Sequence, residues 1–149
     1  VAVLEHNGLP VVEVDSHKSM YKMVSIGRID LFCRGANEAV KEYNHFNNID
    51  GVGFDRTFVL QYDLPVFFFL SKENTEAVKR IKTGLIRSYE NGSLRQLLFK
   101  HFAQSLEFVA LDKRKFYHLE NPYTKDLDPT YKNYYLYSQS EKMTNTLSP

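Results

Sequence analysis

The hydrophobic positions of the first 46 residues alternate between helical and strand-like patterns. Residues 1–4 suit the end of a helix, which Asn7 and Gly8 would terminate. Residues 10–14 (PVVEV) predict a strand, and Ser16 is a favourable N-cap for a helix that Gly27 ends. Residues 29–33 (IDLFC) are almost all apolar, as in a strand buried on both faces, and residues 36–46 predict another helix. This part therefore predicts a β-α-β-α unit.

The second half of the chain begins with a loop at residues 47–53. Residues 57–60 and 66–70 predict two strands, which Asp63, Leu64 and Pro65 separate. Residues 75–90 predict a long amphipathic helix that Asn74 caps, and Ser93 starts a further helix. After residue 111 the periodicity weakens. The tail from residue 121 is polar and rich in tyrosine, so we expect it to wrap around the domain with half-buried rings; a base-stacking surface is the alternative.

Composition limits the classes of protein that fit. A chain of 149 residues with 43% apolar residues makes one domain or two small lobes. The net charge of +1 gives no strong field for nucleic acid or an anionic membrane. The basic residues between positions 79 and 87 are therefore interpreted as a solvated helix face. The longest apolar run, residues 66–70, is far too short to span a bilayer. The chain starts at Val1, inside an expected helix and without a signal peptide, which we interpret as a processed or truncated protein.

The sequence contains no recognisable catalytic constellation. There is no glycine-rich phosphate loop, no His-Glu-x-x-His motif and no Cys-x-x-Cys motif, and the five histidines are far apart without metal-ligand spacing. The single cysteine, Cys33, lies in an expected apolar strand, which predicts a buried and inert thiol. Asp30 in the same strand is interpreted as a hydrogen-bonded structural residue. We therefore expect no enzyme activity, no cofactor and no metal site.

Three segments resemble a known family. "HNGLPVVEVD" (6–15), "YKMVSIGRIDLF" (21–32) and "DLPVFFFLSKENTEAVKRIKTGLIRSYENGSLRQLLFKHF" (63–102) are similar, in this order, to the second-lobe and closing segments of the type 2 periplasmic solute-binding proteins. That family includes the amino-acid receptors of ABC importers. The resemblance covers residues 1 to about 103 and leaves out most of the N-terminal lobe.

The resemblance implies an α/β fold that is a partial form of the binding-protein fold, with two small α/β lobes and a hinge crossing. Residues 1–62 would be most of the second lobe, residues 63–103 would return to the first lobe, and residues 104–149 would be a C-terminal extension packed on the first lobe. Two separate cores would follow from this division. Their expected members are Val12, Val14, Met23, Ile29 and Leu31 in one, and Phe67, Phe69, Ile81, Leu85, Leu97 and Leu98 in the other.

By the same resemblance, the protein would be a periplasmic transport receptor that holds a small polar solute and delivers it to the membrane subunits of an ABC importer. A sensory input domain of a membrane receptor or kinase is one alternative. A non-catalytic binding-protein-like module of a cell-wall enzyme is another. Because the expected sheet lacks strands, we expect the isolated chain to dimerise, to exchange segments or to retain an N-terminal fragment.

The end of the 29–33 segment is the predicted ligand site. In amino-acid-binding members of the family, an acidic residue five positions after the signature aspartate binds the ligand's ammonium group. Counted from Asp30, that position is Gly35, and Arg34 precedes it. Asn37 would add an amide, and the following helix N-terminus would favour anions. Arg34, Gly35 and Asn37 therefore predict a site for a neutral or anionic solute; the alternative is that Arg34 faces solvent or pairs with a carboxylate such as Glu38.

Overall fold

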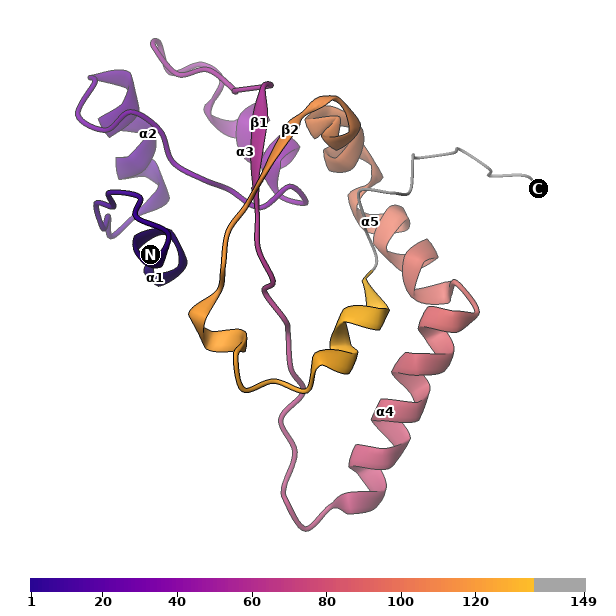
Figure 1. The fold of residues 1–149 in the computed structure, drawn as a ribbon. Coiled ribbons are helices and arrows are strands. Elements are labelled where there is room, and N and C mark those ends of the chain that lie inside the picture. Colours follow the sequence, from indigo (N-terminus) through magenta and orange to yellow (C-terminus); the bar gives the residue numbers. More distant parts are fainter. Residues whose placement is uncertain (136–149) are drawn as a thin grey trace. The chain divides into compact units, whose positions relative to one another are not determined.

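The computed structural model describes residues 1–135, which form a small mixed α/β protein (Figure 1). The α-helices are α1 (Ala2–His6), α2 (His17–Ser25), α3 (Ala39–Phe46), α4 (Thr75–Glu90) and α5 (Ser93–Val109). The strands are β1 (Phe58–Gln61) and β2 (Lys115–His118), and short 3-10 helices occupy Leu111–Lys113, Pro122–Thr124 and Pro129–Tyr134. The expected α/β class is confirmed at this coarse level.

The chain divides into two compact units. The first unit contains residues 1–63 and 102–125, and the second contains residues 64–101 and, within the described part, residues 126–135. The first boundary follows Asp63, at the position where the sequence places its hinge. The second falls inside α5, and the structure groups residues 102–125 with residues 1–63. The assignment of these units to the lobes of a binding protein stays a prediction.

Local sequence signals set the helices. The side chain of Ser16 accepts a hydrogen bond from the backbone N–H of Ser19 (3.2 Å), and Asn74 accepts one from Ala77 (3.1 Å). These bonds satisfy N–H groups that lack partners in the first turn of α2 and α4. Gly27 and Gly92 follow their helices with φ of +67° and +77°, a conformation that side chains with a Cβ rarely adopt. The expected helix starts and stops are confirmed at these positions.

The sheet consists of two parallel strands in the described residues. β1 pairs with β2 from Phe58 opposite Lys115 to Gln61 opposite His118. The prediction of a strand near residues 57–60 is confirmed. β2 was not predicted, because its four residues follow a stretch of weak periodicity. Both strands belong to the first unit.

Three expected strands are absent. Residues 10–14, 29–33 and 66–70 contain no helix or strand, so the predicted β-α-β-α unit is wrong in its strands. Their composition favours extended backbone, but a strand also needs a neighbouring chain to accept and donate its hydrogen bonds. No described segment provides that neighbour. The expected helix at residues 36–46 also begins later, at Ala39.

The hydrophobic core lies in the first unit. Its buried apolar residues come from α2, α3, α5 and the turn after α5: Tyr21, Ala39, Leu106, Val109 and Leu111. The two predicted cores are wrong in composition. Val12 and Leu31 of the first set are exposed, as are Phe67, Phe69, Leu85 and Leu97 of the second. Val12, Leu31, Phe67 and Phe69 lie in segments that have no strand partner, whereas Leu85 and Leu97 lie on exposed faces of α4 and α5.

The expected burial of Cys33 is wrong, and the expected burial of the tail tyrosines is wrong at one position. Cys33 is exposed, because residues 29–33 do not enter a sheet. In the tyrosine-rich tail, Tyr123 is 74% exposed, which contradicts the expected half-buried rings, whereas Tyr134 and Tyr135 are 41% and 43% exposed, as expected of half-buried rings. The Tyr134 ring meets the edge of Tyr89 with centroids 5.3 Å apart. Tyr137 lies outside the described residues.

Candidate functional site

The predicted site residues lie between α2 and α3, in the loop that precedes α3. Arg34 donates from Nε to Glu42 (2.6 Å) and from Nη2 to both Glu42 and Glu38, the latter at 3.0 Å. Glu42 lies within α3, and Glu38 is its N-cap residue. The side chains of Arg34 and Glu42 are 25% and 18% exposed, whereas Glu38 is 50% exposed. Arg34 therefore pairs with two carboxylates, one of them largely shielded from water.

Tyr21 fixes the shielded carboxylate from the side of α2. Its ring stacks on Phe46, with centroids 4.0 Å apart, and meets the edge of Phe32 at 4.7 Å. Its hydroxyl donates to Oε2 of Glu42 (3.3 Å). Because the ring is buried, its position is set by packing. Glu42 is thus held by a hydroxyl from one helix and a guanidinium from the loop.

The charges of this cluster stabilise one another. The hydrogen bond from Arg34 holds the pKa of Glu42 below its ordinary value, and the same bond raises the pKa of Arg34. Burial, reinforced by the Glu42 carboxylate, raises the pKa of the Tyr21 hydroxyl. At neutral pH the cluster contains one guanidinium and two carboxylates, so its net charge is negative. This charge works against binding of an anion beside Arg34.

Gly35 and Asn37 belong to a turn between Arg34 and α3. The backbone N–H of Glu38 donates to the carbonyl of Gly35 (3.0 Å), which closes this turn. A Cβ added at Gly35 would lie 2.7 Å from Oδ1 of Asn37 and 3.4 Å from Oε2 of Glu38. The turn thus brings Gly35, Asn37 and Glu38 together. The side chain of Asn37 is exposed and makes no hydrogen bond within residues 1–135.

The position of the α3 N-terminus changes the expected anion site. The helix starts at Ala39, so Glu38, which was expected inside the helix, is its N-cap residue. Its carboxylate does not cap the helix but binds Arg34. A negative side chain therefore already stands at the positive end of the α3 dipole. The Arg34–Glu38 pair is the alternative that the sequence left open.

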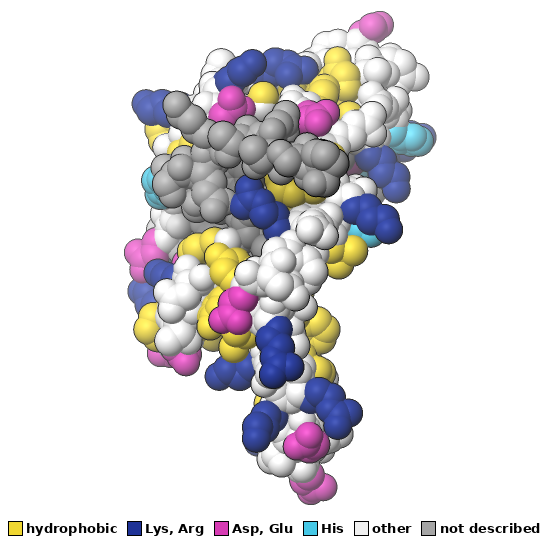
Figure 2. Space-filling model, turned by 90° about the vertical axis from the view of Figure 1, so that its right-hand side faces the viewer, with side chains coloured by type: hydrophobic (Ala, Val, Ile, Leu, Met, Phe, Trp, Pro, Cys, Tyr) yellow, Lys and Arg dark blue, Asp and Glu magenta, His cyan; other side chains and the backbone are white. Residues whose placement is uncertain are grey.

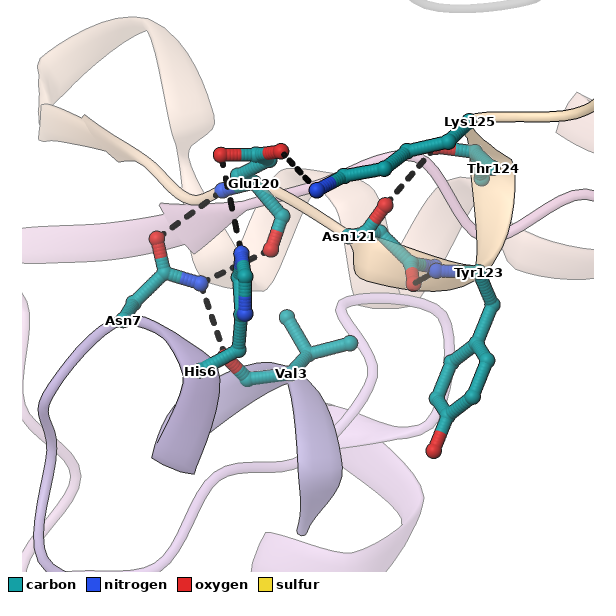
Figure 3. Close-up of polar contacts among 8 residues, drawn as sticks. All are labelled: Val3, His6, Asn7, Glu120, Asn121, Tyr123, Thr124 and Lys125. Carbon is teal, nitrogen blue, oxygen red and sulfur yellow. Dashed lines mark hydrogen bonds and ion pairs between the residues drawn. The ribbon is translucent and has the colours of Figure 1, made fainter.

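A second polar cluster joins α1 to the segment after β2 (Figure 3). The side chain of Asn7 donates to the carbonyls of Val3 (2.7 Å) and Glu120 (2.8 Å) and accepts from the N–H of Glu120 (3.0 Å). The carboxylate of Glu120 lies 3.5 Å from His6 and 3.4 Å from Lys125. The hydrogen bond and charge of Lys125, with a smaller contribution from His6, lower the pKa of Glu120. Asn7 therefore not only ends α1 but also joins it to the segment after β2.

A third cluster surrounds Arg114, between α5 and β2. Its guanidinium donates to the carbonyls of Val109, Asp55 and Phe58, with the latter two at 2.9 and 3.0 Å. It also lies over the Phe54 ring, 5.0 Å from the centroid. Burial lowers the pKa of Arg114. Since it ties β1 to the end of α5 through backbone atoms, we interpret Arg114 as a structural residue.

The sequence does not reveal the Arg114 and Asn7 clusters, because each joins segments that are more than 50 residues apart: Arg114 binds Asp55, and Asn7 binds Glu120. Within residues 1–135, no group of three His, Cys, Asp or Glu side chains is arranged to hold a metal ion. The same part of the chain contains no helix that is long and apolar enough to cross a membrane. Comparison with family models, curated protein sequences and solved structures found no match.

Proposed function

We propose that this chain is part of a solute-binding protein that holds a small polar solute and presents it to the membrane subunits of an ABC importer. The proposal rests on the three segments that resemble the type 2 periplasmic solute-binding proteins in their expected order. The division of the chain after Asp63 supports it, since a hinge crossing was expected there. Function in the periplasm is part of the same proposal.

The proposed ligand site contains Arg34, Gly35 and Asn37. Two groups here are available to a polar solute: the Nη1 group of Arg34, which makes no hydrogen bond in the described chain, and the free amide of Asn37. The side-chain oxygen of Asn37 lies beside Gly35, where an added Cβ would come within 2.7 Å of it. Together the two groups offer donors from a guanidinium and both a donor and an acceptor from an amide.

The charge around Arg34 narrows the class of solute. Glu38 and Glu42 compensate the guanidinium, so an anion would meet two carboxylates within the same cluster. A neutral solute with hydroxyl or amide groups avoids this repulsion and uses the donors of Arg34 and Asn37. We therefore propose a neutral polar solute rather than a dicarboxylate or a phosphate ester.

Calorimetric titration of the full-length encoded protein tests this proposal. Neutral polyols and amides, zwitterionic amino acids, dicarboxylates and inorganic phosphate form the panel. We expect a neutral solute to bind, and Asn37→Ala to weaken its binding about tenfold, the effect of losing one or two hydrogen bonds. Asn44→Ala, an exposed amide within α3, is the matched control and should leave binding unchanged.

Three results would contradict the proposal. Binding of none of these solutes would remove the transport-receptor function. Binding that Asn44→Ala weakens as much as Asn37→Ala would place the solute elsewhere. A dicarboxylate bound more tightly than any neutral member of the panel would overturn the argument from charge.

A further inference from the structure

Residues 64–70 form a highly exposed apolar segment of the second unit. The segment LPVFFFL contains no charged or hydrogen-bonding side chain. Val66 and Phe69 are 90% and 94% exposed, and Leu64, Phe67, Phe68 and Leu70 are also exposed. Figure 2 shows apolar side chains open to solvent among Lys and Arg in the part of the molecule that carries α4. A contiguous apolar segment of this kind marks an interaction surface.

The backbone of this segment also lacks partners. Residues 64–70 lie in neither helix nor strand, and none of them donates or accepts a hydrogen bond within the described chain. Figure 1 shows them in the open trace that leads into α4. Valine and phenylalanine favour extended backbone, and Pro65 directs Leu64 to it as well. The segment thus offers a row of free N–H and C=O groups to another strand.

We propose that the partner is the same segment of a second copy of this chain, paired as antiparallel strands with Phe67 on the two-fold axis. In a parallel pair, Asp63 would face Asp63 and Lys72 would face Lys72 of the other copy, which is unfavourable. An antiparallel pair centred on Phe68 would place Asp63 opposite Glu73 of the other copy. Centring on Phe67 avoids every like-charge pair, because Asp63 then faces a serine and Lys72 faces a tyrosine.

Proline supports this register. Residues that face each other in an antiparallel pair alternate between hydrogen-bonded and non-hydrogen-bonded positions. When the two copies of Phe67 form a non-hydrogen-bonded pair, Pro65 also occupies a non-hydrogen-bonded position, where its missing N–H costs nothing. Leu64, Val66, Phe68 and Leu70, which all have an N–H, then fill the hydrogen-bonded positions. The two Phe67 rings meet at the closest approach of the strands.

The second unit also offers apolar surface to cover the faces of this ribbon. A two-stranded ribbon alone is only marginally stable in water. Val78 and Leu85 of α4 and Leu97 of α5 are 46%, 40% and 52% exposed, and they lie in the same unit as the segment. Packing of these helix faces against the paired strands would complete the interface of the dimer.

Two matched proline variants test the hydrogen-bond pattern in the full 149-residue chain. In this register Phe68 donates its N–H to the partner strand, whereas the N–H of Phe69 points away from it. We expect Phe68→Pro to raise the dissociation constant of the dimer at least about tenfold, since two intermolecular hydrogen bonds are lost. Phe69→Pro removes a ring of the same size and should have a clearly smaller effect. Sedimentation equilibrium of wild type and both variants gives the dissociation constants.

Disulfide cross-linking tests the two-fold axis independently of stability. In a Cys33→Ser background, Phe67→Cys places two thiols at a non-hydrogen-bonded pair, where the Cα–Cα separation of about 4.5 Å suits a disulfide. We expect covalent dimers under mild oxidation with Phe67→Cys and far fewer with Phe68→Cys. A monomer at all concentrations, equal effects of the two prolines, or equal cross-linking at both positions would overturn the proposal. Solute binding plays no part in these measurements, so they do not depend on the proposed function.

Discussion

Replacing Glu42 by alanine tests how the Arg34 cluster holds α2 to α3. The carboxylate accepts hydrogen bonds from Nε and Nη2 of Arg34 and from the hydroxyl of Tyr21. Hydrogen bonds to a charged group contribute about 1.5–3 kcal/mol each, but contributions that share one group do not add. After truncation, Arg34 still binds Glu38 and reaches water through its 25% exposed side chain, so part of the loss is recovered. We therefore expect Glu42→Ala to lower the free energy of unfolding by about 2 kcal/mol.

Glu38→Ala is the matched control, because it removes a carboxylate that binds the same guanidinium. Its side chain is 50% exposed and solvent screens its charge, so we expect a loss of about 0.5 kcal/mol or less. Urea unfolding followed by far-UV circular dichroism measures both values. At a slope of about 2 kcal/mol per M, Glu42→Ala should shift the midpoint by about 1 M.

The result that would refute this reasoning is equal destabilisation by the two substitutions. It would mean that exposure of the carboxylate does not decide the strength of its bond to Arg34. A third variant, Tyr21→Phe, separates the contributions. We expect it to cost about 1 kcal/mol, since it removes one hydrogen bond and keeps the stacked ring. If Tyr21→Phe costs as much as Glu42→Ala, the hydroxyl rather than Arg34 holds the carboxylate.

Three further predictions concern acid stability, a glycine in the loop after α3 and the side chain of Asn7. Arg34 lowers the pKa of Glu42 in the folded protein, so the contribution of Glu42 to the free energy of unfolding is full above the unfolded-state pKa and is lost as the pH falls through the lowered pKa. Glu42→Gln should therefore make stability depend less on pH in the acid range, measured by urea titrations at several pH values. Gly51→Ala should cost about 1–2 kcal/mol, because Gly51 has φ of +79° and its Cβ would lie 3.1 Å from the carbonyl oxygen of the last residue of α2; Gly53→Ala, with open space around it and no positive φ, should be near neutral in the same thermal melts. Asn7→Ala should lower the free energy of unfolding by about 1–2 kcal/mol and speed hydrogen exchange in α1, since two of the three hydrogen bonds of Asn7 hold the segment after β2. Unchanged exchange in α1 would show that Asn7 does not hold α1 in place.

The sequence by itself determined the helices, because their signals are local. Ser16 and Asn74 cap α2 and α4 within three residues, and Gly27 and Gly92 end helices through a backbone conformation that glycine adopts freely. The Arg34–Glu38 pair is local as well, since its two residues are four positions apart in the turn that leads into α3. All of these contacts close within a few residues, so a pattern of neighbours is enough to predict them.

The tertiary structure decided the strands, the core and the balance of charge at the candidate site. Residues 29–33 and 66–70 have strand composition, but no described segment pairs with them. β1 is a strand because it pairs in register with β2, which lies 57 residues later in the chain. The second carboxylate on Arg34 comes from within α3 and is fixed by Tyr21 of α2, which the sequence places 21 residues earlier. A strand forms only with a hydrogen-bonding partner, and the net charge of a cluster depends on which charged side chains come close to it. Both are set by which distant segments pack together.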